Sequence, residues 1–277
     1  DFIKAFAQRG RELGLEVLVE IHSYYKRQME IAKQVDWVYD FALPPLVLHA
    51  LEFGRSGPLL DWIAQRPNNA VTVLDTHDGI GIIDIGADAA DRTNNPGLVP
   101  PAELDELVER MHRNSMNQSR LATGAAASNL DLYQVNCTFF DALGRHETAY
   151  LVARAIQFFV PGIPQVYYVG LLAGENDMDL LAKTKVGRDI NRHYFSREEV
   201  LQALQKPVVA RLLDLIRLRN EHPAFQGAFS HSASNDQVLT LTWAAETDWI
   251  RLEVDLSAKT GVIHHSAPTG EQRLTLS

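Results

Sequence analysis

The stretch Leu15-Glu-Val-Leu-Val-Glu-Ile21 is a short run rich in apolar and branched residues, which predicts a strand that is buried on both faces. An amphipathic segment over residues 24–35 follows it and predicts a helix. The unit then recurs, because residues 37–43 predict a second strand and residues 44–53, which open with prolines suited to a helix start, predict a second helix. Alternating strands and helices indicate an α/β fold with a parallel sheet.

The same alternation continues further along the chain. Residues 70–75 predict a third strand, and residues 165–169 predict a fourth that follows a helical segment at 147–160. A long helix is expected at 207–221. We therefore expect the C-terminal half of a (β/α)8 TIM barrel, in which chemistry takes place at the carboxyl ends of the strands.

The segment between the third and fourth strands and the C-terminal tail have a different character. About ninety residues separate those two strands, too many for an ordinary loop, and an acidic amphipathic stretch at 101–118 predicts a helix among them. After Phe225 the apolar period becomes two, as in residues 238–243 and 249–256, which predicts a small antiparallel β-domain. The predicted divisions are 1–80 (barrel strands 5–7), 81–145 (an inserted subdomain), 146–225 (the end of the barrel with strand 8) and 226–277 (the β-domain).

The composition excludes several classes of protein. With 277 residues, 46% of them hydrophobic, the chain can bury a sizeable core and is not predominantly disordered. The formal net charge is −9 and no block of Lys and Arg stands out, so nucleic acid is not an expected partner. The apolar runs are too short to cross a bilayer, and the single cysteine, Cys137, is interpreted as a small core residue.

The first residues show a helical pattern without a start signal. Phe2, Ile3, Phe6 and Leu13 fall on one helical face and Gly14 is suited to end the helix, but no N-cap residue precedes them. We therefore expect that the chain lacks an N-terminal part.

Two side chains that can do chemistry come at the end of the first predicted strand. Glu20 is suited to general acid catalysis, and the alternative is a carboxylate in a capping or ion-pair role. His22 follows two residues later and is either functional or a partner of backbone groups near the strand end.

The third predicted strand ends in a second polar cluster. His77 and Asp78 are placed to bind vicinal hydroxyls and to offset positive charge on a reacting carbon, unless they form a polar turn capped by Asp. Asp75 is interpreted as structural. A metal site made of Asp75, His77, Asp78 and Asp84 lacks a recognised ligand spacing, so no metal is expected.

Two later segments also contain candidate ligand-binding residues. Small residues from Ala125 onward precede alternating polar groups, which indicates either a mobile lid over a ligand or an ordinary structural loop. The polar groups in question are Asp131, Tyr133 and Gln134. Arg188 is suited to clamp a hydroxyl or carboxylate, or else forms a surface ion pair with Asp189.

Several of these motifs together resemble one enzyme family. The motifs are Glu-Val-Leu-Val-Glu20-Ile-His22-Ser-Tyr-Tyr, Val-Tyr-Asp-Phe-Ala-Leu-Pro-Pro, Arg66-Pro-Asn-Asn-Ala-Val-Thr-Val-Leu-Asp-Thr-His77-Asp78-Gly-Ile-Gly, Ala-Ala-Ser-Asn-Leu-Asp131-Leu-Tyr133-Gln134 and Gly-Arg188-Asp-Ile-Asn-Arg-His-Tyr. They closely resemble the sucrose phosphorylase family, which belongs to the α-amylase-type retaining glycosidases. The resemblance extends from the first residues into the C-terminal β region and weakens after about residue 225.

The resemblance implies a retaining double displacement. An aspartate attacks the anomeric carbon of the glucosyl unit of sucrose, a glutamate protonates the departing fructose oxygen, and phosphate then takes the glucosyl group to give α-glucose 1-phosphate. Such a mechanism uses two carboxyl groups about 5–5.5 Å apart and no cofactor. The compartment implied is the cytoplasm, where phosphate is available.

The resemblance also assigns roles to individual residues. Glu20 matches the acid/base of the family, and Asp78 matches the carboxylate that stabilises the transition state. His77 and Arg188 match further contacts of the glucosyl unit. The residues that match the acceptor site, three of them on a loop that rearranges between fructose and phosphate binding, are His22, Asp131, Tyr133 and Gln134.

One element of the family pattern is not found in this sequence. The family nucleophile lies just ahead of the helix with which this chain opens, so we expect the nucleophile upstream of Asp1 and no turnover by residues 1–277 alone. The alternatives are a related phosphorylase for glucosylglycerol, glucosylglycerate or sucrose 6-phosphate, plain hydrolysis, or an inactive carbohydrate-binding fragment.

Overall fold

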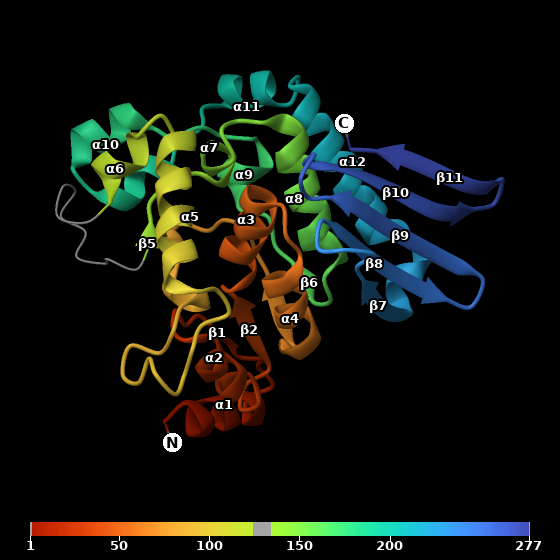
Figure 1. Cartoon of the computed structure of the whole chain (residues 1–277), viewed down its shortest axis with the longest axis horizontal. Helices are drawn as coiled ribbons and strands as arrows, with labels where there is room; N and C mark the ends of the chain where they lie inside the picture. Colours follow the sequence, from red (N-terminus) through yellow and green to blue (C-terminus); the bar gives the residue numbers. More distant parts are fainter. Residues whose placement is uncertain (1, 124–133, 277) are drawn as a thin grey trace.

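A four-stranded parallel sheet forms the framework of the molecule. The computed structural model describes residues 2–123 and 134–276. The sheet has the order β1-β2-β3-β6, so that its strands lie side by side in chain order (Figure 1). The strands are β1 (Leu18–Val19), β2 (Trp37–Asp40), β3 (Ala70–Thr72) and β6 (Ile163–Pro164). This arrangement is that of consecutive strands of a (β/α)8 barrel and confirms the predicted fold class.

Helices connect these strands and cover the sheet. The chain begins with α1, and the connecting helices are those predicted, except that α4 was not expected. Helix α4 is short and has glycine and polar residues at its ends, so apolar periodicity alone did not predict it. The helices of this part are α1 (Phe2–Glu12), α2 (Tyr25–Ala32), α3 (Leu43–Phe53), α4 (Gly57–Gln65) and α8 (Glu147–Phe159).

The strands are shorter than predicted, and the fourth was placed wrongly. The prediction put that strand at 165–169, but the chain pairs with β3 through β6 and turns into helix α9 (Tyr168–Leu171). The Gln157 side-chain amide donates to the carbonyl oxygens of Thr72 and Gln165, both at 2.9 Å. The backbone N–H of Gln165 also donates to the Thr72 carbonyl oxygen at 2.9 Å, so the Gln157 side chain reinforces the last contact between β3 and the segment after β6.

Two short paired strands connect distant parts of the insertion between β3 and β6, next to the carboxyl end of β3. Strands β4 (Ile80–Gly81) and β5 (Gln134–Val135) pair antiparallel, with Gly81 opposite Gln134. Helix α5 (Pro101–Asn114) stops before the predicted residue 118 because Met116 and Asn117 have positive φ angles of 53° and 62°. The remaining elements are η1 (Ile83–Ile85), α6 (Gln118–Ala122) and α7 (Phe139–Ala142).

The C-terminal part is a five-stranded antiparallel sheet of order β11-β10-β9-β8-β7, as predicted (Figure 1). It packs against α8 and against α12 (Pro207–Glu221), the long helix predicted at this position. Its strands are β7 (Ala228–Ser232), β8 (Val238–Ala245), β9 (Asp248–Asp255), β10 (Thr260–Ala267) and β11 (Gly270–Thr275). The elements before it are α10 (Met178–Thr184), η3 (Gly187–Asn191), α11 (Arg197–Ala203) and η4 (Pro223–Gln226).

Helix α8 lies at the centre of the main core. Every residue from Ala149 to Phe159 is buried, and the helix contacts both α3 on the barrel side and strands β8, β9 and β10 of the C-terminal sheet. Among the described residues, no helix is both long and apolar enough to span a membrane. The division of the chain at residues 80, 145 and 225 stays a prediction.

Candidate active site

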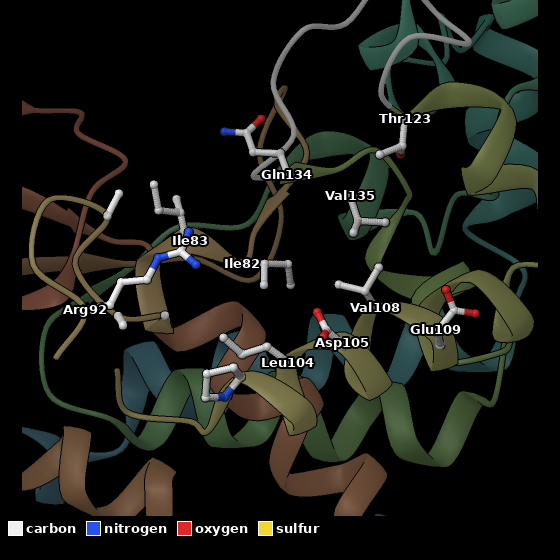
Figure 2. A pocket seen from close by; sticks show the side chains of 14 residues that line it. Ile82, Ile83, Arg92, Leu104, Asp105, Val108, Glu109, Thr123, Gln134 and Val135 are labelled. Atoms are coloured by element: carbon white, nitrogen blue, oxygen red, sulfur yellow. The ribbon is translucent and has the colours of Figure 1, made fainter. Parts of the chain in front are cut away.

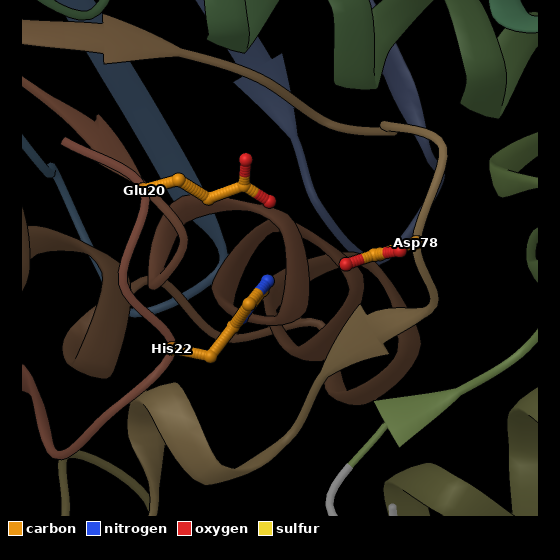
Figure 3. Close-up of side chains that lie close together, drawn as sticks. All are labelled: Glu20, His22 and Asp78. Carbon is orange, nitrogen blue, oxygen red and sulfur yellow. The ribbon is translucent and has the colours of Figure 1, made fainter. Parts of the chain in front are cut away.

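The site is built at the carboxyl ends of β1 and β3, as the barrel geometry predicts. Glu20 and His22 follow β1, and Asp78 follows β3. One oxygen or nitrogen atom from each of these three side chains lies within 4.8 Å of the others. Figure 3 shows the three side chains pointing toward one another. The fold thus brings two carboxylates and an imidazole to one point, although β2 lies between the two strands that supply them.

Asp78 is buried and surrounded by cationic groups. Its Oδ1 lies 2.9 Å from Arg188 Nη1 and 3.3 Å from Arg192 Nη2, and His77 Nε2 lies 3.5 Å away. The exposed His77 and the half-buried Arg188 are therefore both next to Asp78. Two guanidinium groups fix the orientation of the carboxylate.

Sequence reasoning missed the residues that hold the backbone of this strand end. Asn191 Nδ2 donates to the carbonyl oxygens of Thr76 at 3.1 Å and of Asp78 at 2.9 Å, and Arg192 Nε donates to that of His77 at 2.7 Å. Asn191 is buried and lies in the short η3 helix that also contains Arg188. No spacing in the sequence singles out Asn191 and Arg192, because η3 is a short 3-10 helix that ends before Arg192.

His22 is held from two sides. Its ring stacks on Phe41 with 3.9 Å between the ring centroids, and its Nδ1 lies 2.8 Å from Asp84 Oδ2. Burial alone would lower the pKa of His22, but the hydrogen bond to Asp84 and the charges of Asp84, Asp78 and Glu20 outweigh burial and raise the pKa above its ordinary value.

Glu20 has a different environment. It is exposed and borders a small cavity of about 50 Å³ lined also by Tyr39, Phe41, His77 and Tyr167. Among the described residues, no hydrogen bond or ion pair involves its carboxylate. This carboxylate is free to exchange protons with a ligand or with water.

Asp75 pairs with a residue of the core rather than with Glu20, His22 or Asp78. Its Oδ2 accepts a hydrogen bond of 2.6 Å from Nη2 of Arg154, which is fully buried in α8. The four-residue metal set considered from the sequence does not form, because Asp75 pairs with Arg154 and Asp84 with His22.

Glu20, His22 and Asp78 are close enough for a metal ion to bridge them. However, a cation between them would meet the guanidinium groups of Arg188 and Arg192, which already neutralise Asp78. We therefore interpret the three residues as an acid–base and electrostatic group.

The predicted acceptor loop is described only at its end. Asp131 and Tyr133 lie outside the described residues. Gln134 is buried in β5 and lines a cavity of about 520 Å³ (Figure 2). Its walls are apolar where Leu104 and Val108 of α5 line it, with Asp105 and Glu109 at its margin. This cavity contains neither Glu20 nor Asp78, so its size alone does not mark it as the site of chemistry.

Known proteins were compared with the sequence and the structure. No family model matches the sequence. Sucrose phosphorylase of Agrobacterium vitis is 60% identical over 92% of this chain and 52% of its own length. Sucrose phosphorylase of Bifidobacterium adolescentis is 55% identical over 94% of this chain and 51% of its own length. The chain belongs to the sucrose phosphorylase family. It spans about half the length of these curated relatives.

Solved structures agree with membership of the sucrose phosphorylase family. The crystal structure of sucrose 6F-phosphate phosphorylase from Thermoanaerobacter thermosaccharolyticum matches with a TM-score of 0.86 and 37% identity, over 99% of this chain and 55% of that one. Three α-amylase structures match with TM-scores of 0.52 to 0.59 at 13–18% identity and share the fold alone. The sucrose phosphorylase family is thus built on the amylase-type barrel, part of which this chain forms.

Proposed function

We propose that the protein transfers a glucosyl group from sucrose to phosphate, giving α-glucose 1-phosphate and fructose with retention of configuration. The observation that supports this most is the convergence of Glu20 and Asp78 at the barrel's strand ends, in a chain 60% identical to a sucrose phosphorylase. We also propose the cytoplasm as its compartment, because both phosphate and the sugar phosphate product belong to central metabolism there.

In the first step, Glu20 acts as the general acid. The nucleophilic aspartate bonds to C1 as the bond between C1 of glucose and the fructose oxygen breaks; the electron pair of the broken bond stays with that oxygen, and Glu20 supplies the proton. In the second step a phosphate oxygen bonds to C1 as the bond between C1 and the aspartate breaks, the electron pair returns to the aspartate carboxylate, and the phosphate proton passes to Glu20. The exposed position of Glu20 suits a group that must exchange a proton in each direction.

In both steps positive charge develops at C1 and the ring oxygen. Asp78 is proposed to stabilise it and to bind the sugar hydroxyls, because its carboxylate is fixed in place before the substrate arrives. His77 and Arg188 are proposed as further glucosyl contacts. The proposed nucleophile is an aspartate outside residues 1–277.

The acceptor side is proposed to consist of His22, Asp131, Tyr133 and Gln134. The structure describes two residues of this group. His22 lies next to Glu20, and Gln134 lies in β5, which pairs with the short strand β4 that follows Asp78. A phosphorylase with another leaving group is the second candidate, favoured by the match to a sucrose 6F-phosphate phosphorylase structure.

A panel of donors tests both candidates. Protein expressed from its complete coding sequence is incubated with phosphate and one of sucrose, sucrose 6-phosphate, glucosylglycerol or glucosylglycerate, and glucose 1-phosphate and free glucose are quantified. We expect sucrose to give the highest kcat/KM and glucose 1-phosphate as the main product. Preference for another donor would select the second candidate, mainly free glucose would indicate hydrolysis, and binding without product would indicate a carbohydrate-binding protein.

A further inference from the structure

Asp84 is a fully buried carboxylate that the proposed reaction does not use. It lies in η1, within the insertion, and three donors surround it. Ser23 N donates to Oδ1 at 3.0 Å, Gln28 Nε2 donates to Oδ1 at 2.8 Å, and His22 Nδ1 lies 2.8 Å from Oδ2. Burial raises the pKa of Asp84 above its ordinary value, and the hydrogen bonds from His22 and Ser23 oppose that rise by stabilising the charged form.

This arrangement fixes which nitrogen of His22 faces the site. The ring nitrogen next to a carboxylate oxygen carries a proton, so Nδ1–H donates to Asp84 and Nε2 is left for another partner. Nε2 is buried and has no hydrogen-bond partner among the described residues. Figure 3 shows the free end of the ring directed between the carboxylates of Glu20 and Asp78.

The surrounding chain is shaped to accept the Asp84–His22 pair. A Cβ atom on Gly81 would lie 2.0 Å from Asp84 Oδ2 and 3.0 Å from His22 Nδ1, so any other residue at position 81 would displace the pair. On the other side, the ring of Phe41 lies parallel to the imidazole with an interplanar angle of 14°. The imidazole is thus held at one edge by Asp84 and across one face by Phe41.

We infer that Asp84 is a positioning residue that keeps His22 cationic, with Nε2–H directed at the space between Glu20 and Asp78, where it binds an anionic oxygen of the acceptor. The inference rests on the proposed function in that phosphate is the acceptor. A phosphate entering this space meets the negative charges of Glu20 and Asp78, and an imidazolium beside them reduces the repulsion.

Charged groups around His22 agree with this role. Three carboxylates face His22 from η1 and from the ends of β1 and β3, and all three favour its protonated form: Asp84, Glu20 and Asp78. The nearby cationic groups, Arg188 and Arg192, are paired with Asp78. Because these carboxylates raise the pKa of His22 above its ordinary value, the ring stays cationic to a higher pH than a free histidine. Use of phosphate should therefore decline as the pH rises through this raised pKa.

The variant Asp84→Asn tests the inference in protein expressed from its complete coding sequence. The amide keeps the shape and the partners of Asp84 but donates to His22 Nδ1, which leaves the ring neutral with a proton on Nε2. We expect the KM for phosphate to rise about tenfold or more, while release of free glucose into water changes less than about threefold, because only the charged interaction is lost. Asp61→Asn, on the exposed surface of α4, is the matched control.

A second measurement is independent of turnover. The titration of His22, followed by NMR of the histidine Cε1–H groups and assigned with His22→Gln, should move to lower pH in Asp84→Asn. An unchanged His22 titration together with an unchanged KM for phosphate would overturn the inference, as would equal losses in phosphate use and in glucose release.

If Asp84→Asn does not fold, His22→Gln, which supplies a neutral donor, should show the same selective loss with phosphate. If the unaltered protein cleaves none of the donors, the proposed function fails, and the titration still decides the role of Asp84.

Discussion

The two strand ends that form the site are built in opposite ways. At the end of β3, Asp78 is buried, its carboxylate contacts two arginines, and consecutive backbone carbonyls around it are held by Asn191 and Arg192. At the end of β1, Glu20 is exposed, and the described residues provide no partner for its carboxylate. The difference suits a fixed charge that stabilises a transition state and an accessible group that moves protons.

The largest effect should come from removing the fixed charge. Asp78→Asn keeps the shape of the side chain but removes the negative charge that two guanidinium groups contact and leaves C1 without a stabilising anion. We expect kcat/KM to fall by at least about 10³-fold with every donor, because this charge acts in both steps. Steady-state assays with sucrose and with α-glucosyl fluoride check this. Asp179→Asn, exposed on α10, is the control, and loss with sucrose alone would contradict the role given to Asp78.

Removing the proton donor should have a large effect that depends on the donor. Glu20→Gln should lower kcat/KM for sucrose by about 10²- to 10⁴-fold, because fructose leaves as a poor leaving group without protonation. Cleavage of α-glucosyl fluoride should be much less affected, since fluoride needs little acid assistance. Burst-phase release of fluoride measures this step directly. Equal losses with both donors would mean that Glu20 is not the acid, and Glu198→Gln, exposed on α11, serves as the control.

A smaller effect is expected from loosening the backbone of the β3 end. Arg192→Met removes the donor to the His77 carbonyl and one of the two guanidinium groups next to Asp78. We expect kcat to fall about ten- to a hundredfold with little change in the thermal unfolding midpoint, because small displacements of catalytic groups lower the rate steeply. Kinetics and a thermal scan on the same sample test this. A normal kcat would show that the backbone needs no such support.

The smallest effect concerns the segment after Arg192. His193 Nδ1 lies 2.6 Å from Asp177 Oδ2 and Nε2 lies 3.2 Å from Glu199 Oε1. Burial lowers the pKa of His193, but the hydrogen bonds to these carboxylates outweigh it and raise the pKa. Because the folded-state pKa is raised, the stabilisation is complete below the unfolded pKa and is lost as the pH rises through the folded pKa.

His193→Gln should therefore lower the unfolding midpoint by about 1–2 °C at pH 5.5 and by less at pH 8, as expected for a half-exposed ion pair. Thermal scans of both proteins across this pH range measure the difference. A deficit that grows with pH would contradict the assignment of the raised pKa.

Much of the framework could be predicted from the sequence, because periodicity reports which faces are apolar. The strand–helix alternation, α12 and the antiparallel tail were all confirmed. The predicted strands were too long. A branched apolar run such as residues 15–21 predicts that the segment is buried, but not at which residue its hydrogen bonds to the neighbouring strand end. The fourth strand was misplaced because the pairing with β3 involves residues 163–165, whereas the apolar run at 165–169 turns into helix α9.

The site could be predicted only in part, for a related reason. Glu20, His22 and Asp78 are found by a rule about strand ends, which needs only local sequence. Asp84, Asn191 and Arg192 act through backbone atoms or through another side chain, and such partners are set by tertiary contacts that no spacing reveals. The residues missed by sequence reasoning are thus mostly those that orient others.

The indole of Trp243 in β8 donates to the carbonyl oxygen of Phe159 at 2.7 Å, at the last residue of α8. That helix also contains Arg154, which anchors Asp75 just ahead of His77 and Asp78. The C-terminal sheet therefore cannot be exchanged without affecting α8. Grafting or trimming it would uncover the apolar flank of α8 and release the support behind Asp78, so domain exchange within the sucrose phosphorylase family should transfer helix and sheet as one block.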